Sequence, residues 1–430
     1  MSTQRVDVVV VGAGLAGLTA ARELGRRGHR VVVIEGRDRL GGRAWTAPFA
    51  GIDVEMGGAY VHWIQPHLWS ELTRYGLGIV ATNENDRVTL RDDDGAVELE
   101  ERDFEDITAS FAAPCHDAPS LLPNPMVAPE GDDVRGADRL SARDRLDATD
   151  IPDRIRGFVD AMCSGMSSRP NDEVGYLTIA KTFALASFDR ELMLAANASF
   201  TIEGGTKALV DAIAADVRGE IRTGTPVEAI SQDGHDVIVR TSEGETNASA
   251  VVVAVPMNTL SSIGFERGLS ATKADAAQRG VGGLGVKVWA KLAGGSSDAL
   301  VSAPDRFPLT FVETAGPTPD GGTPVVGFGP SAAALPLADA ELVAKAIEEM
   351  LPGAVVKEVG GHDWVDDPFS RGTWAANRPD TWVRWLPEID RPEGRITFAG
   401  GDIARGWQGY LDGAIETGLR AARETDAILA

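Results

Sequence analysis

A glycine-rich turn near the N-terminus constrains the fold more than any other feature of this sequence. Residues 6–11 form a short β-branched run, which is typical of a buried parallel strand. The turn at 12–17 ends that run, and apolar residues then recur at helical spacing over 15–24. A second strand is expected at 31–35. This strand–helix–strand unit predicts a doubly wound, Rossmann-like α/β domain.

The turn has the Gly-x-Gly-x-x-Gly spacing that binds dinucleotides. Its first glycine permits the tight turn, its second lets a pyrophosphate approach the backbone, and its third lets helix and strand pack closely. The free N–H groups at the helix N-terminus then face the phosphates. A glutamate ends the second strand, where a carboxylate accepts hydrogen bonds from a ribose diol. The expected dinucleotide contacts are Gly12, Ala13, Gly14, Ala16, Gly17 and Glu35.

This pattern alone fits NAD as well as FAD, and the residues that follow it favour FAD. The chain continues from the glutamate through two arginines, a Gly-Gly pair and a third arginine. Such a block neutralises a pyrophosphate that stays bound rather than exchanging. A strand expected at 227–230 adds one further contact. The additional expected cofactor contacts are Gly36, Arg37, Gly42, Arg43 and Val227.

Composition excludes several partners. With 41 basic and 64 acidic residues, the 430-residue chain has a formal charge of −23, so nucleic acid and anionic membranes are not expected partners. Without a signal peptide or a long apolar run, a cytoplasmic location is expected. Two cysteines without a CxxC pair argue against a disulfide framework, and no metal site is expected. A homodimer is the default oligomer.

The length predicts two to three domains. Further strands are expected at 237–241 and 250–255, and strands of a second sheet at 286–292 and 309–314. Residues 81–150 are rich in Asp, Arg, Pro and Ala, which indicates irregular segments and polar helices, and 151–200 are expected to be helical. We expect an FAD-binding domain of residues 1–80, 201–285 and 388–430, and a discontinuous α+β substrate-binding domain of residues 81–200 and 286–387.

The block at 35–43 and four later segments resemble the flavin-containing amine oxidase superfamily. The later segments are Glu-Met-Gly-Gly-Ala-Tyr-Val at 55–61, the lysine segment at 282–287, the aromatic turn at 362–374 and the C-terminal motif at 398–414. The resemblance is greatest to the monoamine oxidase branch, including bacterial enzymes acting on nicotine-like amines. Thr373 stands where some members have a flavin-bonded cysteine, so the resemblance implies non-covalent FAD. Asp402 replaces the usual glutamate and is one methylene shorter.

The resemblance also implies roles for individual residues. Lys287 would hold a water against flavin N5, while Trp374 and Tyr410 would form an aromatic cage that orients the amine nitrogen. The helix starting near Leu411 would aim its N-terminus at the flavin N1–C2=O edge. His62 is a candidate substrate contact. The further cofactor contacts implied are Gly57, Gly58, Ala59, Tyr60, Trp364, Gly401, Asp402, Gly409, Tyr410, Leu411 and Ala414.

The implied reaction is FAD-dependent oxidation of a small amine to an imine, by hydride transfer to flavin N5 with dioxygen giving hydrogen peroxide. An amino-acid oxidase would also fit the superfamily, but its carboxylate substrate needs an arginine clamp, and residues 57–62 contain no arginine. A carbon-skeleton desaturase and an FAD-binding protein without turnover are also compatible with the resemblance. The walls of the substrate pocket are expected from residues 81–200 and 300–330, where no motif identifies the substrate.

Overall fold

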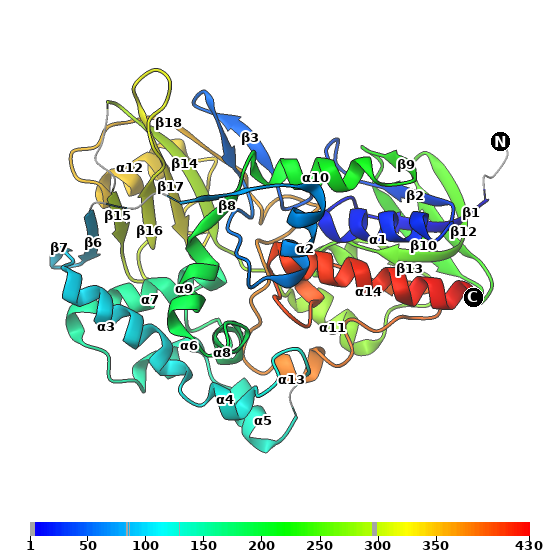
Figure 1. The fold of residues 1–430 in the computed structure, drawn as a ribbon, viewed down its shortest axis with the longest axis horizontal. Coiled ribbons are helices and arrows are strands. Elements are labelled where there is room, and N and C mark those ends of the chain that lie inside the picture. Colours follow the sequence, from blue (N-terminus) through cyan, green and yellow to red (C-terminus); the bar gives the residue numbers. More distant parts are fainter. Residues whose placement is uncertain (1–4, 83–84, 86, 129, 295–298) are drawn as a thin grey trace.

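The computed structural model describes residues 5–82, 85, 87–128, 130–294 and 299–430. These residues form two large sheets with helices around them (Figure 1). The first sheet has eight strands in the order β13-β10-β11-β12-β1-β2-β9, and β19 also pairs with β12. Their bounds are β1 Arg5–Val11, β2 Val31–Ile34, β9 Gly219–Arg222, β10 Val227–Gln232, β11 Val237–Thr241, β12 Gly244–Val253, β13 Gly264–Phe265 and β19 Ile396–Phe398.

The valine run of β1 is buried on both faces of this sheet. β1 pairs in parallel with β2 on one side and with β12 on the other. Val8 and Val10 join the apolar cluster of the helices, whereas Val9 and Val11 join the opposite cluster with β10 and β11. A strand covered on both faces needs apolar residues at every position, which explains the unbroken run. The predicted Rossmann-like fold is confirmed.

Helices from both ends of the chain cover one face of the first sheet. Figure 1 shows α1 (Leu15–Arg26) and α14 (Leu411–Leu429) running side by side, and the two pack against each other. α10 (Gly205–Ala215) also packs on α1. The C-terminal helix therefore starts beside the glycine-rich turn, although the two lie at opposite ends of the sequence.

The second sheet contains strands from two distant parts of the chain. Its order is β18-β14-β17-β16-β15-β6-β7, and β6 pairs in parallel with β15. Residues 81–150 were expected to form irregular segments and polar helices. The structure corrects this at β6 and β7, where Val88 and Leu90 are buried at alternate positions of β6. The bounds are β6 Arg87–Asp92, β7 Gly95–Glu98, β14 Val286–Leu292, β15 Ala299–Ser302, β16 Phe311–Thr314, β17 Thr323–Gly329 and β18 Val356–Gly361.

A group of helices lies beneath the second sheet in Figure 1. They include α7, which contacts β6 and β15, and confirm that 151–200 is helical.

No helix in the described part of the chain is long and apolar enough to cross a membrane. The remaining elements are α2 Pro66–Tyr75, α3 Glu101–Ala112, α4 Ala118–Leu121, α5 Asp132–Asp138, α6 Ala142–Asp147, α7 Asp153–Ser167, α8 Tyr176–Leu185, α9 Arg190–Ala198, α11 Ala271–Arg279, α12 Ala340–Met350, α13 Trp382–Trp385, and the hairpins β3 Thr46–Phe49 with β4 Ile52–Glu55 and β5 Ile79–Ala81 with β8 Phe200–Ile202.

Candidate active site

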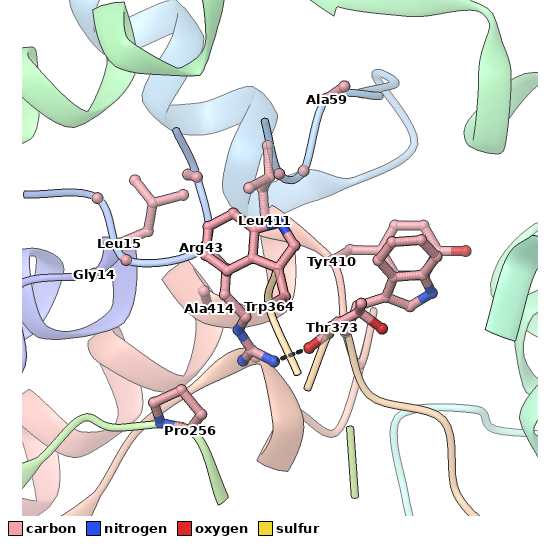
Figure 2. A pocket seen from close by; sticks show the side chains of 18 of the residues that line it. Gly14, Leu15, Arg43, Ala59, Pro256, Trp364, Thr373, Tyr410, Leu411 and Ala414 are labelled. Atoms are coloured by element: carbon pink, nitrogen blue, oxygen red, sulfur yellow. Dashed lines mark hydrogen bonds between the residues drawn. The ribbon is translucent and has the colours of Figure 1, made fainter. Parts of the chain in front are cut away.

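A single cavity of about 840 Å³ extends from the glycine-rich turn to the second sheet. Figure 2 shows part of its wall, with Gly14, Arg43, Trp364 and Tyr410 facing the same space. Most of the residues proposed from the sequence line this cavity. They are Gly12, Gly14, Ala16, Glu35, Gly36, Arg37, Gly42, Arg43, Gly57, Gly58, Ala59, Tyr60, Val227, Lys287, Trp364, Trp374, Gly401, Gly409, Tyr410, Leu411 and Ala414.

The three glycines of the turn have different environments. Gly12 has φ +100°, and a Cβ on Gly17 would lie 1.9 Å from the Gly12 carbonyl oxygen, so both positions require glycine. Gly14 has an ordinary φ of −74°, and the nearest atom to an added Cβ is 3.8 Å away. Gly14 is therefore needed only if something in the cavity approaches the backbone closely.

Ala13 and Gly17, two of the predicted cofactor contacts, lie behind this wall and support it. The Ala13 N–H donates to Glu35 Oε2 at 2.6 Å, and the Arg37 N–H donates to Oε1 of the same carboxylate at 2.9 Å. Neither Ala13 nor Gly17 is among the residues that line the cavity. They shape the turn, while Glu35 faces the cavity.

A buried ion pair fixes the orientation of Arg43. Its Nη2 lies 2.7 Å from Asp402 Oδ1, and its Nη1 donates to the Thr373 carbonyl at 2.5 Å, the bond drawn in Figure 2. The other Asp402 oxygen accepts the Met257 N–H at 3.0 Å. Asp402 was proposed as a cofactor contact. It lies behind the wall, 1% exposed, where it holds the arginine that faces the cavity.

Side chains from outside the first sheet bind three consecutive carbonyls at residues 55–57. The indole N–H groups of Trp289 and Trp364 donate to the carbonyls of 55 and 56 at 3.1 and 2.9 Å, and Lys287 Nζ donates to that of 57 at 2.9 Å. Burial lowers the pKa of Lys287 to about 8, although Glu55 opposes the shift. An amine with this pKa can hold or release a proton near neutral pH.

Trp374 and Tyr410 both line the cavity and are anchored by the helices beneath the second sheet. The Trp374 indole N–H donates to the Met166 carbonyl at 2.7 Å, and the Tyr410 hydroxyl donates to Asn197 Oδ1 at 2.6 Å. Burial raises the pKa of Tyr410 to about 12, so its phenol stays neutral. The sequence predicted neither anchor, because the Met166 carbonyl on α7 and the Asn197 amide on α9 do not belong to a recognisable motif.

His62, proposed as a substrate contact, does not line the cavity. Its ring is buried and stacks on Trp63 with ring centroids 4.0 Å apart, next to Phe200. Its Nδ1 accepts the Ile64 N–H at 3.3 Å. Burial lowers the pKa of His62, which favours the neutral ring. Local packing therefore explains this histidine.

The substrate end of the cavity is mostly apolar and comes from the expected parts of the chain. Phe158, Met162 and Met166 line it from one face of α7 at a spacing of four residues. This spacing is the same as in any buried helix face, so the sequence could not mark them as pocket residues. The other lining residues in these parts are Thr82, Asn85, Phe111, Gly165, Leu194, Asn197, Ala198, Ser199, Leu300, Phe311, Glu313 and Phe328.

One group of described side chains has the composition of a metal site, namely His67, Asp412 and Glu416. One Asp412 oxygen accepts the N–H groups of His67 and Leu68, and the other lies 3.2 Å from His67 Nδ1. The Glu416 oxygens accept two further backbone N–H groups. These carboxylates thus connect the start of α14 to neighbouring segments.

Comparison with known proteins places the chain in a family. The model of the family described as flavin containing amine oxidoreductase matches residues 15–425. The pseudooxynicotine dehydrogenase of a Pseudomonas species is 36% identical over 440 residues, which cover 98% of this chain and 86% of that protein. The (S)-6-hydroxynicotine oxidase of Paenarthrobacter nicotinovorans is 30% identical, with 96% and 97% covered.

A solved structure shows the same fold. A triple variant of putrescine oxidase superposes with a TM-score of 0.84 at 23% identity, covering 98% of this chain and 99% of the other. The family match covers most of the chain, including the second sheet, the first sheet apart from β1, and most of the residues that line the cavity. The chain therefore belongs to the flavin-containing amine oxidoreductases, enzymes that oxidise amines with a flavin cofactor.

Proposed function

We propose that this protein is an FAD-dependent amine oxidase that holds FAD non-covalently and oxidises a small amine to an imine. The observation that supports this most is the continuity of one cavity. It joins a dinucleotide-binding turn at one end to Lys287, Trp374 and Tyr410 at the other. A flavin dinucleotide needs both parts within one space, because its ring must reach the substrate while its pyrophosphate stays on the turn.

The cavity wall fits such a cofactor. The open space over Gly14 lies at the N-terminus of α1, where free N–H groups favour phosphate. Thr373 lines the cavity, and its buried Oγ1 has no partner among the described residues. A threonine offers no thiol for a covalent bond, and Cys115 and Cys163 are buried in another apolar cluster. These features support non-covalent binding.

The side chains of the substrate end have separate tasks in this proposal. When bound, the flavin accepts a hydride from the substrate carbon and passes the electrons to an acceptor. Trp374 and Tyr410 contact the amine through ring faces that attract its nitrogen. The apolar residues of α7 exclude water, and Lys287 holds a proton or a water at its Nζ. Water then hydrolyses the imine to a carbonyl compound and ammonia or a smaller amine.

We also propose the two-domain division expected from the sequence. The strands of the first sheet lie within residues 1–80, 201–285 and 388–430, and those of the second within 81–200 and 286–387. We assign FAD to the first unit and the amine to the second. A cytoplasmic homodimer remains a prediction.

An amino-acid oxidase is disfavoured by the same wall. Among the described residues that line the cavity from 81–200 and 286–330, none is an arginine, so a substrate carboxylate has no bidentate partner there. Arg371 also lines the cavity, but it follows Phe369, whose ring lies against Gly36 at the cofactor end. The relatives do not identify the electron acceptor that reoxidises the flavin, because one is named a dehydrogenase and another an oxidase. We propose dioxygen, with hydrogen peroxide as the product.

Purified protein tests this proposal. It should show flavin absorption, and acid precipitation should release FAD into the supernatant. Monoamines, polyamines and heterocyclic amines are then added anaerobically, and at least one class should bleach the flavin. Admission of air should restore the colour with one peroxide per turnover, whereas recovery only with an artificial dye would indicate another acceptor. Absence of flavin, or of bleaching by any amine, would contradict amine oxidation.

A further inference from the structure

One carboxylate lies at the substrate end of the cavity, away from the cofactor turn. Lys287 on β14 pairs with Phe328 on β17, which pairs with Phe311 on β16, so these three form one row on one face of the second sheet. Glu313 follows Phe311 by two residues and shares that face. Two strand spacings and a rise of two residues separate Glu313 from Lys287, so their Cα atoms lie about 12 Å apart.

The surroundings of Glu313 include one buried acceptor, Asn85 Oδ1, that has no donor in the described part of the chain. Asn85 Nδ2 donates to Glu313 Oε1 at 3.0 Å. No lysine, arginine or histidine of the described residues lowers the pKa of Glu313, and the Asn85 bond is the one contact that does. Burial raises the pKa of Glu313, because its charge is not compensated.

A half-buried carboxylate without a cationic partner is stabilised by a ligand that brings a positive charge to it. Glu313 is the one carboxylate among the described residues that line the cavity from 81–200 and 286–330. Its neighbours on the wall include Leu300, directly opposite on β15, and Phe311. A ligand that fits has an apolar middle and an N–H-rich, positively charged end.

We propose that Glu313 and Asn85 bind a second protonated nitrogen of the substrate, so that the preferred substrates are amines with two basic nitrogens joined by an apolar spacer. This inference rests on the proposed function, since the first nitrogen is the one oxidised. The carboxylate and the Asn85 carbonyl accept hydrogen bonds from the second nitrogen while the reactive end lies near Lys287.

The test compares α,ω-diamines from propane to octane with n-alkylamines of the same length, measured as kcat/KM and as anaerobic flavin reduction. The wild-type enzyme should prefer the best diamine over its monoamine about 10- to 100-fold, the worth of one charge-assisted hydrogen bond. Glu313→Gln should reduce this ratio to near one. Glu358→Gln, the same charge change at an exposed position on β18, is the matched control.

A second measurement needs no variant. Acetylation of one end of each diamine removes its second charge and should lower kcat/KM about as much as Glu313→Gln does. An unchanged diamine preference in Glu313→Gln, or none in the wild type, would overturn the second-nitrogen site while monoamine oxidation stands. Failure of every amine to reduce the flavin would instead overturn the proposed function.

Discussion

Replacing Gly14 by alanine should separate cofactor binding from folding. An added Cβ would have no described atom closer than the Gly41 carbonyl oxygen at 3.8 Å, and φ of −74° suits alanine. The apoprotein should therefore change in stability by no more than about 1 kcal/mol. The methyl group would instead occupy the space that a pyrophosphate needs against the backbone N–H groups.

The expected loss follows from the hydrogen bonds displaced. One charged hydrogen bond contributes about 1.5–3 kcal/mol, so the Kd for FAD should rise about 10- to 100-fold. At an FAD concentration of 100 times the wild-type Kd, the cofactor stabilises the wild type by about 2.7 kcal/mol. A 100-fold weaker variant would gain only about 0.4 kcal/mol under the same conditions.

The assay is urea unfolding of deflavinated protein with and without added FAD, together with direct titration of FAD. Gly17→Ala is the control, because its Cβ would lie 1.9 Å from the Gly12 carbonyl oxygen and should destabilise the apoprotein itself. The reasoning is refuted if Gly14→Ala binds FAD as tightly as the wild type, or if it unfolds as readily as Gly17→Ala.

Four other experiments test separate parts of the structure. Asp402→Asn removes the negative charge opposite Arg43 and should lower the free energy of unfolding by about 1.5–3 kcal/mol, measured in urea, with loss of bound flavin. Burial lowers the pKa of Lys181 to about 8, below its usual 10.5, so the folded protein binds fewer protons than the unfolded chain between these values. The wild type should gain up to about 3 kcal/mol relative to Lys181→Met as pH rises from 8 to 10.5, and equal pH profiles would exclude this account. Tyr410→Phe keeps the ring and should retain kcat/KM for amines, whereas Tyr410→Leu should lower it about 10-fold. Burial raises the pKa of Cys115 to about 12 and also raises that of Cys163, so a thiol reagent at pH 8 should label neither until the protein is unfolded.

The sequence predicted those parts of the fold in which one short segment determines its own environment. Gly17 must be glycine because of its contact with Gly12, and the β1 valines must be apolar because both faces are covered. Strand β6 was missed because Arg91 and the aspartates after it dominate its composition. The alternation of Val88 and Leu90 was a usable signal.

The features of the site that the sequence did not predict depend on contacts between distant segments. Asn197 anchors Tyr410 across 213 residues, and Asn85 faces Glu313 across 228. Neither asparagine belongs to a pattern, because nothing local fixes which polar side chain of a helix or loop reaches the cavity. The role of Asp402 behind Arg43 was missed for the same reason.

The bonds to the carbonyls of residues 55–57 have a consequence for assembly. Trp289 and Lys287 come from β14 of the second sheet, and Trp364 follows β18 of that sheet. The backbone of residues 55–57 is therefore held by side chains of the second unit. A variant that lacks β14 and the segment after β18 would keep the strands of the first sheet and lose the support of residues 55–57. We therefore expect the complete flavin site to form only when both sheets are in place.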